Sequence, residues 1–430
     1  MNKSYSFEEL LSHSRKHSRY YKTHFKHLPE RHCTIDNLPL TVASDYWNGS
    51  NNLNTWSVLT GKTENALIYK TGGSTGQEKL VAYTRAEWQN MVTQFGHSLS
   101  GQLCDGDRVA NLFFAGDLYA SFLFIHDSLA HVTCAICEFP FAGEVDGATL
   151  AAAITEQQIN VLAGVPAQLL QFAAYLAEQH HVLPQVTTVL YGGESLFAAQ
   201  WSMLLEVFPN ARVASIGYAC VDAGLVGAST RDCELGEHRV FDEQTVVEII
   251  DEHTHEVIEE CNRPGLLIIT NLTRTLMPLL RYPVGDRACW REPSAAPRRK
   301  FALLGRSEQS HRIRIGVMSL FQEEIGEILQ RLADCWQWQL VLESVGIKDR
   351  ISVMWVPEQG ASSVNASTQA IYAALLAQYP DIRQMIGNDQ LECVVSPCTV
   401  STLQLHPRSG KQRRIVDLRV YSTPKRQPTP

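Results

Sequence analysis

The sequence predicts an α/β protein: a large N-terminal domain of parallel sheets flanked by helices plus a small antiparallel sheet or barrel, then a small α+β domain. Three observations support this. Apolar runs alternate with helical patterns between residues 108 and 218, as in parallel sheets covered by helices. Short alternating runs joined by turns fill Glu237–Arg291. After Pro293–Arg299, which reads as a linker loop, the alternation of strands and helices restarts.

The N-terminal elements are predicted to be helical and then extended. Ser6 and Glu9 have the spacing of a capping box, so an amphipathic helix should run from Ser6 to Phe25. The polar stretch 29–54 indicates loops with short helical pieces. The next expected elements are a strand at 66–69, a strand at 80–84 and a helix at 85–99.

The remaining elements follow from hydrophobic periodicity. For the parallel sheets we expect strands at 108–114, 131–137, 161–165, 187–193 and 213–218, with helices at 119–129, 149–157, 167–179 and 197–208. The antiparallel part should contain strands at 246–250, 266–272 and 288–290. Later elements are strands at 301–305, 339–345, 351–356 and 391–396 and helices at 321–332 and 367–379. We expect a core domain at 1–305 and a second domain at 306–430.

Composition excludes several classes of protein. The formal net charge of −8 argues against nucleic acid as the main partner, and no apolar run reaches membrane-spanning length. The cysteines are odd in number, eleven, and scattered, which fits the reduced thiols of a cytoplasmic protein. Cys134 and Cys137 lie in an apolar run, so buried thiols are favoured over a redox or metal pair.

A glycine-rich segment follows the first predicted strand. Glycines let a backbone bring its N–H groups close to an anion, and hydroxyls and a lysine add donors and positive charge. The natural ligand is a polyphosphate, although the segment lacks the Gly-Lys-Ser/Thr order of a Walker loop, and an ordinary turn is the alternative. The candidate phosphate-binding residues are Thr71, Gly72, Gly73, Ser74, Thr75, Gly76 and Lys79.

Further glycines and polar residues follow later strands, where ligands bind in parallel sheets. An aromatic side chain there can stack on a base, and a carboxylate can hold a cation or ribose hydroxyls. Taken singly, Tyr218 could be core, Asp286 could cap a turn and Lys411 could be solvated, but their order and spacing favour a site. The candidates are Gly192, Gly193, Glu194, Tyr218, Asp222, Asp286, Arg306 and Lys411.

This ordered set resembles the adenylate-forming superfamily, which includes acyl-CoA synthetases, nonribosomal peptide adenylation domains and firefly luciferase. It is most similar to the phenylacetate–CoA ligase branch. The resemblance covers nearly the whole chain, from HSRYYKTHF at 17–25 to HPRSGKQRRIVD at 406–417. It implies that ATP activates a carboxylic acid as an acyl adenylate, with release of pyrophosphate, and that the acyl group then passes to a thiol, usually that of coenzyme A.

The resemblance assigns the ATP-binding candidates by motif. Thr71–Lys79 would hold the β- and γ-phosphates, and Gly192–Glu194 would line the adenine. Tyr218 would stack on the base. Asp286 would accept hydrogen bonds from both ribose hydroxyls, and Arg306 would also contact the ribose.

The resemblance also implies the catalytic residues and a domain motion. Asp222 stands where the family has the acid that helps to hold Mg²⁺. Lys411 matches the mobile lysine that bridges the carboxylate and the α-phosphate. A hinge near Glu308 would rotate the mobile C-terminal domain and remove Lys411 before thioester formation.

Some positions depart from the family pattern. Val221 lacks a hydroxyl that normally faces the phosphates, and Asp222 is one methylene shorter than the usual Glu. Many relatives carry a Cys-x-Cys-Gly cluster where this chain has Ser294–Pro297. Cys233 and His238 remain from that possible metal set, and a structural zinc is not expected.

Three functions remain open. The leading hypothesis is an AMP-forming acid–thiol ligase for an aromatic or aryl-acetic acid, with ATP, Mg²⁺ and coenzyme A. The second transfers the acyl group to a carrier-protein thiol or an amine in secondary metabolism, and the third binds nucleotide without turnover. A homodimer is left open. Candidate walls for the acid, each equally plausible as core, are Phe113, Phe114, Phe139, Phe141 and Tyr191.

Overall fold

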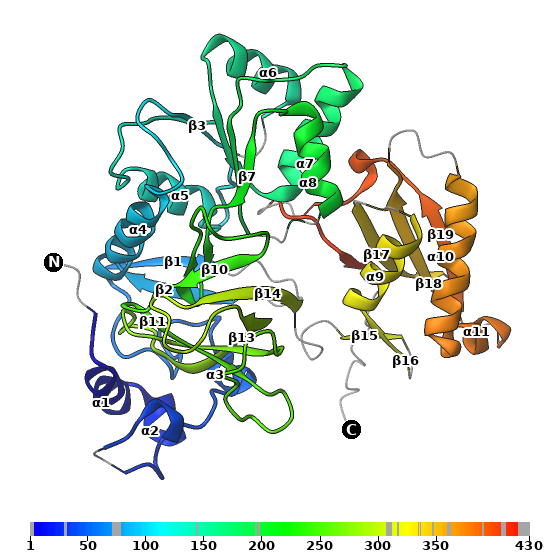
Figure 1. Ribbon diagram of the computed structural model, residues 1–430. Coiled ribbons are helices and arrows are strands. Elements are labelled where there is room, and N and C mark those ends of the chain that lie inside the picture. Colours follow the sequence, from blue (N-terminus) through cyan, green and yellow to red (C-terminus); the bar gives the residue numbers. More distant parts are fainter. Residues whose placement is uncertain are drawn as a thin grey trace, which may run out of the picture. The chain divides into compact units, whose positions relative to one another are not determined.

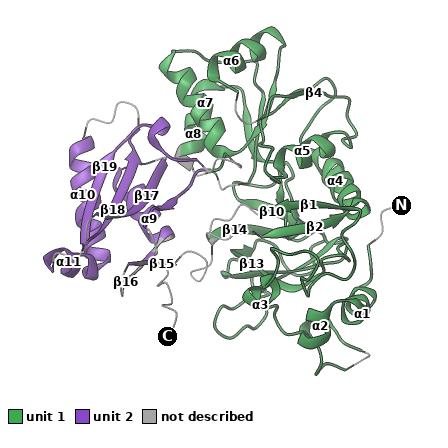
Figure 2. Ribbon diagram, turned by 180° about the vertical axis from the view of Figure 1, so that it is seen from behind, with its two compact units in different colours: residues 1–310, 407–411 green, residues 311–406, 412–430 purple. Residues whose placement is uncertain are grey.

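The computed structural model of the chain forms two compact units, which Figure 2 shows in green and purple. Unit 1 comprises Met1–Ser310 and Pro407–Lys411, and unit 2 comprises His311–His406 and Gln412–Pro430. The division at 305/306 into parts that move independently stays a prediction. The structure describes residues 4–29, 32–70, 79–142, 145–193, 196, 198–306, 312–315, 318–333, 335, 337–345, 348–358, 363–388, 391–405 and 410–419.

Unit 1 contains the expected parallel sheet, with strand order β4-β3-β5-β6-β7. Helices α4 and α5 pack together, as do α7 and α8, and Figure 1 shows these pairs on opposite sides of the sheet. The strands are β3 (Arg108–Asn111), β4 (Cys137–Pro140), β5 (Val161–Gly164), β6 (Thr188–Tyr191) and β7 (Arg212–Ser215). The helices are α4 (Arg85–Leu99), α5 (Ser121–Leu129), α6 (Gly147–Glu156), α7 (Pro166–Glu178) and α8 (Ala198–Val207).

One strand of this sheet begins later than predicted. Residues 131–136 form a loop, and β4 starts only at Cys137. The N–H of Ala135 donates to Asp105 Oδ1 at 2.7 Å, and a donor used by a side chain cannot join a strand ladder. The prediction of buried thiols here is also wrong, because Cys134 is only half-buried and Cys137 is exposed.

The antiparallel part of unit 1 is a seven-stranded sheet with order β11-β12-β13-β14-β10-β9-β8. The supposed linker 293–299 joins β13 to β14, which pair antiparallel inside this sheet, so the strand after it belongs to unit 1. Proline-rich loops serve hairpins as well as linkers. The strands are β8 (Tyr218–Cys220), β9 (Gly224–Ala228), β10 (Glu237–Val240), β11 (Thr245–Ile250), β12 (Gly265–Asn271), β13 (Leu279–Trp290) and β14 (Lys300–Arg306).

The N-terminal region is helical, as expected, but its helix is broken at Ser18. The predicted capping box of Ser6 and Glu9 is present. Ser18 ends the first helix and caps the start of the second. Its hydroxyl accepts a hydrogen bond from the N–H of Tyr21, in the first turn of that second helix, at 3.3 Å. The elements are α1 (Phe7–His17), α2 (Arg19–His24), the 3₁₀ turn η1 (Ile35–Asn37), α3 (Ala43–Trp47) and the antiparallel pair β1 (Ala66–Lys70) and β2 (Leu80–Thr84).

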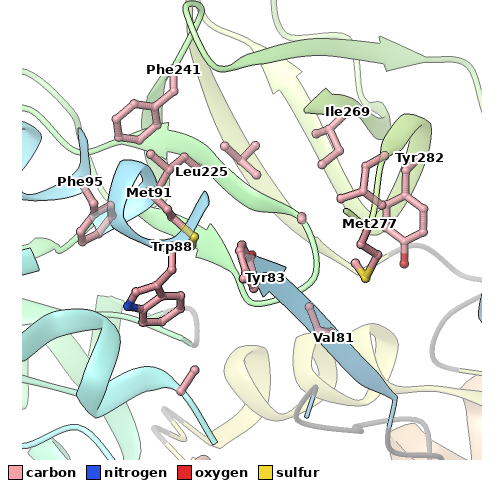
Figure 3. Packing of buried hydrophobic residues seen from close by; sticks show 14 of the residues in the cluster. Val81, Tyr83, Trp88, Met91, Phe95, Leu225, Phe241, Ile269, Met277 and Tyr282 are labelled. Atoms are coloured by element: carbon pink, nitrogen blue, oxygen red, sulfur yellow. The ribbon is translucent and has the colours of Figure 1, made fainter. Parts of the chain in front are cut away.

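A large aromatic and aliphatic core joins these elements. Figure 3 shows Tyr83 of β2 between Trp88 and Met91 of α4 on one side and Met277 and Tyr282 on the other. Tyr83 is 1 % exposed, and burial of such a ring contributes about 2 kcal/mol or more. The strand that carries the glycine-rich segment is thus fixed by the core.

Unit 2 is an α+β unit with its own core. Its four-stranded sheet has order β19-β18-β17-β20, and β15 pairs with β16. Trp355, Ile371 and Leu375 are buried in its core. The elements are β15 (Arg312–Ile315), β16 (Met318–Phe321), α9 (Gln322–Ala333), β17 (Gln337–Val345), β18 (Lys348–Val356), α10 (Val364–Gln378), α11 (Pro380–Gly387), β19 (Leu391–Pro397), the 3₁₀ turn η3 (Val400–Thr402) and β20 (Ile415–Asp417).

The helices in the described part of the chain are too short or too polar to cross a bilayer.

A buried arginine ties together three separate segments of unit 1. Arg274, 1 % exposed, donates to the carbonyl of Asp222 at 2.5 Å and to the carbonyl of Ala82 at 2.7 Å. Its guanidinium carbon lies 3.7 Å from the ring centroid of Tyr83. A buried guanidinium needs such acceptors. If Arg274 is removed, the two buried carbonyls lose their hydrogen-bond donors.

We expect Arg274→Met to lower the free energy of unfolding of unit 1 by about 3 kcal/mol, because two buried carbonyls lose charged donors. Denaturant titration followed by fluorescence measures this. Arg85→Met, at an exposed arginine in the same unit, is the control and should change little. Equal effects of the two substitutions would contradict the role assigned to Arg274.

Candidate active site

The glycine-rich segment connects the adjacent ends of β1 and β2. Lys70 pairs with Leu80 across the two strands, so the connection starts and ends at one point. Thr71, Gly72, Gly73, Ser74, Thr75 and Gly76 lie outside the described residues, as do Glu194 and Glu308. Lys79 is described, and its Nζ lies 4.9 Å from the ring centroid of Trp47. This lysine is therefore near the end of α3, a contact that the sequence did not predict.

Glycines follow the strands at the carboxyl edge of the parallel sheet. The N–H of Gly192 donates to the carbonyl of Gly164 at 3.1 Å, which continues the pairing of β5 and β6 one residue past the end of β6. A Cβ on Gly192 would lie 2.6 Å from Cγ2 of Ile216, so only glycine fits against the end of β7. Gly193 has φ +83°, which also favours glycine. The edge is thereby kept free of side chains at two positions.

Tyr218 and Asp286, predicted for the base and the ribose, are brought together. The hydroxyl of Tyr218 in β8 donates to Asp286 Oδ2 in β13 at 2.5 Å. Arg306 is the backbone partner of Asp286 across β13 and β14, so both predicted ribose contacts come from one point of the antiparallel sheet. A ring and a carboxylate in this arrangement can offer a stacking face and hydrogen-bond acceptors to a nucleoside.

A buried histidine supports the ring of Tyr218. His238 lies with its ring centroid 5.8 Å from that of Tyr218, and its Nε2 is 3.0 Å from Ser215 Oγ. Burial lowers the pKa of His238 to about 4, so it stays neutral at physiological pH. Cys233 Sγ instead contacts Thr230 Oγ1 at 3.2 Å. In the described part of the chain neither residue belongs to a cluster able to hold a metal.

Asp222 is held by a chain of donors. Its Oδ1 accepts from the N–H of Ala223 at 3.0 Å, and its Oδ2 accepts from the hydroxyl of Tyr282 at 3.4 Å. Trp47 Nε1 in turn donates to the Tyr282 hydroxyl at 2.9 Å. Burial and the nearby Asp222 raise the pKa of Tyr282 well above its ordinary value, so the phenol remains a donor. Lys79, Trp47, Tyr282 and Asp222 thus form one connected series.

Lys411 lies at the carboxyl edge of the parallel sheet. A Cβ built on Gly193 would be 3.0 Å from Lys411 Cε and 3.3 Å from its Nζ. The same point is 3.6 Å from Cγ1 of Val165, the residue after β5. Lys411 is therefore next to a predicted ATP-binding glycine, although 218 positions separate the two (411 − 193).

Several residues that shape this site were not singled out from the sequence. Trp47, Arg274 and Tyr282 act through buried contacts made far along the chain, and Tyr282 alone had a signal, because it begins the motif that contains Asp286. Among the proposed acid-pocket walls, Phe113, Phe114 and Tyr191 are at most 8 % exposed. Phe139 has the Arg108 guanidinium 4.9 Å from its ring centroid.

Two curated proteins are similar to this chain in sequence. The curated phenylacetate–coenzyme A ligase of Aromatoleum evansii is 24 % identical over 373 residues, covering 82 % of this chain and 79 % of that protein. The indoleacetate–lysine synthetase of Pseudomonas savastanoi is 27 % identical over 237 residues, covering 52 % and 53 %.

Solved structures show the same fold. A 2-hydroxyisobutyryl-CoA ligase in complex with 2-HIB-AMP aligns with a TM-score of 0.68 at 14 % identity, covering 95 % of this chain and 87 % of that one. An anthranilate CoA ligase with anthranoyl-AMP aligns with a TM-score of 0.53 at 15 % identity, covering 83 % and 66 %. The family model described as AMP-binding enzyme matches residues 18–274, more than half of the chain. The chain therefore belongs to the AMP-binding enzyme family.

Proposed function

We propose that this protein activates a carboxylic acid with ATP, forming an acyl adenylate and pyrophosphate, and then transfers the acyl group to the thiol of coenzyme A. The observation that carries the proposal is the position of Lys411 against Gly193, in the unit that also contains the Tyr218–Asp286 pair. Membership of the AMP-binding enzyme family and the CoA ligases among the relatives support it.

The adenosine would lie on the carboxyl edge of the parallel sheet. Tyr218 would stack on the base, and Asp286 would exchange its bond with the Tyr218 hydroxyl for bonds from the ribose hydroxyls. Arg306, opposite Asp286 in the ladder, would reach the same ribose. The glycine-rich residues 71–76 and Lys79 would hold the β- and γ-phosphates, which leave as pyrophosphate.

Lys411 would act on the reacting atoms. A carboxylate and the α-phosphate repel each other, and an ammonium between them offsets that repulsion and stabilises the charge that develops at phosphorus. No covalent enzyme intermediate is needed, so positioning and electrostatics supply the catalysis. For the second step we infer a rotation about a hinge near Glu308, which would withdraw Lys411 and admit the thiol.

Asp222 would hold Mg²⁺ together with phosphate oxygens. Mg²⁺ at phosphates usually takes one or two carboxylates, and the Asp222 carboxylate, with a long 3.4 Å contact to Tyr282, is chemically suited to that role. The ion would neutralise phosphate charge. The hydroxyl of Tyr282, 3.4 Å from Oδ2, would help to orient this carboxylate, which is shorter than the expected Glu.

The acid is proposed to be aromatic or aryl-acetic. Phenylacetate and indoleacetate appear in the names of the two curated relatives, and Phe113 and Tyr191 are buried near the same edge of the sheet. Pyrophosphate release measured over a panel of carboxylic acids tests the function. Release with aryl-acetic acids but not with acetate is the expected result, and no release with any acid would contradict catalysis.

One comparison supports a different acceptor for the acyl group. The relative named indoleacetate–lysine synthetase supports transfer to an amine, and a carrier-protein thiol in secondary metabolism is a related option. Supplying coenzyme A, a carrier protein or lysine to the enzyme with its best acid separates these acceptors by product mass. Preference for coenzyme A is the expected outcome.

We expect Lys411→Ala to lower the rate of pyrophosphate release by roughly 10²–10³-fold, as the loss of one preorganised donor does. ATP binding measured by calorimetry should change much less. Lys62→Ala, at a lysine with an 83 % exposed side chain, is the control and should leave the rate unchanged. Release at the wild-type rate by Lys411→Ala would rule out the assigned role.

Asp286→Asn should weaken ATP binding by about tenfold or more, because charged acceptors of ribose hydroxyls are replaced by a neutral amide. Tyr218→Phe keeps the stacking ring and removes only the hydroxyl, so its effect should be smaller. Calorimetry with a non-hydrolysable ATP analogue gives both affinities. A larger loss in Tyr218→Phe than in Asp286→Asn would show that the hydroxyl, not the carboxylate, contacts the nucleotide.

A further inference from the structure

The residue before Lys411 makes an unusually close contact. A Cβ built on Gly410 would lie 1.8 Å from Cε2 and 1.9 Å from Cζ of Phe114, so its backbone rests directly on the phenyl ring. Gly410 also has φ +60°, a conformation that favours glycine. Both the space and the backbone conformation therefore exclude a side chain at this position.

The ring of Phe114 is itself held in place. Phe114 follows β3 and is 8 % exposed. Its carbonyl accepts from the N–H of Phe122 at 2.9 Å and from the hydroxyl of Ser121 at 3.0 Å, at the start of α5. These bonds fix the backbone of Phe114, and burial restricts its ring. Gly410 thus packs on a rigid part of unit 1.

The side chain of Lys411 continues from this contact across a second glycine. Its Cε would be 3.0 Å from a Cβ on Gly193, a separation that leaves no room for a larger residue without movement of the lysine. We call Phe114, Gly193 and Gly410 the lysine seat. Two of its three members are glycines with positive φ, and the third is a buried ring.

We propose that the lysine seat positions Lys411 for adenylate formation, with Phe114 and Gly410 acting on the reaction through the lysine. The inference rests on the proposed function of Lys411. Misplacement of a catalytic group by about 1 Å can cost roughly 10²-fold in rate. Because Lys411 leaves for the second step, the seat should serve only the first.

The test compares the two half-reactions in Phe114→Ala, Gly410→Ala and the double variant. Each single substitution should lower kcat for pyrophosphate release by about 10²-fold with little change in KM for the acid. Reaction of a supplied acyl adenylate with coenzyme A should stay near the wild-type rate. The double variant should be no worse than Gly410→Ala, since removal of the ring relieves the collision with the new Cβ.

A matched control separates contact from backbone strain. Gly106 has φ +89° with nothing within 4 Å of a built Cβ, so Gly106→Ala introduces the strain without the collision. It should leave both half-reactions unchanged. A rise in KM for the acid with unchanged kcat in Phe114→Ala would mean that the ring lines the acid pocket and would overturn the proposal. The proposal would also be overturned by equal decreases in the rates of both half-reactions, or by rate decreases in the two single variants that multiply in the double variant.

A second readout does not depend on activity. Trypsin cleavage after Lys411, followed by mass spectrometry of the full chain, should be faster in Phe114→Ala and Gly410→Ala than in the wild type and Gly106→Ala. Unchanged cleavage in both variants would overturn the seat even if rates fell. An inactive wild type with every acid would instead contradict the proposed function, while faster cleavage in the variants would still support the contact.

Discussion

The arrangement of the site depends on the buried guanidinium of Arg274. It joins the carbonyl of Ala82, in the strand after the glycine-rich segment, to the carbonyl of Asp222, in the turn between β8 and β9. Glu87 secures the same stretch from α4, since its Oε1 accepts from the N–H groups of Thr275 and Leu276 at 2.6 and 2.9 Å. Segments that are distant in sequence are therefore joined by one buried guanidinium. Its burial is tolerated because the carbonyl groups that accept its hydrogen bonds are held in place by the fold.

The two residues at which we expect a departure from the family pattern, Val221 and Asp222, are both contacted by buried tyrosines. The carbonyl of Val221 accepts from the hydroxyl of Tyr83 at 2.7 Å, so the backbone at this position is fixed although the side chain offers no hydroxyl. The shorter carboxylate of Asp222 faces Tyr282, which Trp47 orients. The backbone at Val221 and the carboxylate of Asp222 are thus each held by a hydrogen bond from a buried tyrosine.

Periodicity and capping predicted most elements of unit 1, because Ser6–Glu9 and the apolar runs act through local contacts. The errors have tertiary causes: Asp105 takes a backbone donor from 131–136, and 293–299 closes a hairpin that no local pattern distinguishes from a linker. The ordered motifs indicated Tyr218, Asp286 and Lys411. They could not indicate Arg274 or the contact of Gly410 with Phe114, since the burial of a charge and the approach of a backbone to a ring arise only in the folded chain.

The hairpin loop 293–299 offers a practical handle on the molecule. In the region where β13 and β14 pair, Asp286 lies opposite Arg306 at one end and Trp290 lies opposite Phe301 at the other. Four residues of strand separate those ends by roughly 14 Å at about 3.4 Å per residue. The loop is largely exposed, and exposed hairpin tips tolerate insertions. A fluorophore or an affinity peptide placed there would tag unit 1 for single-molecule distance measurements while staying away from Asp286 and Arg306.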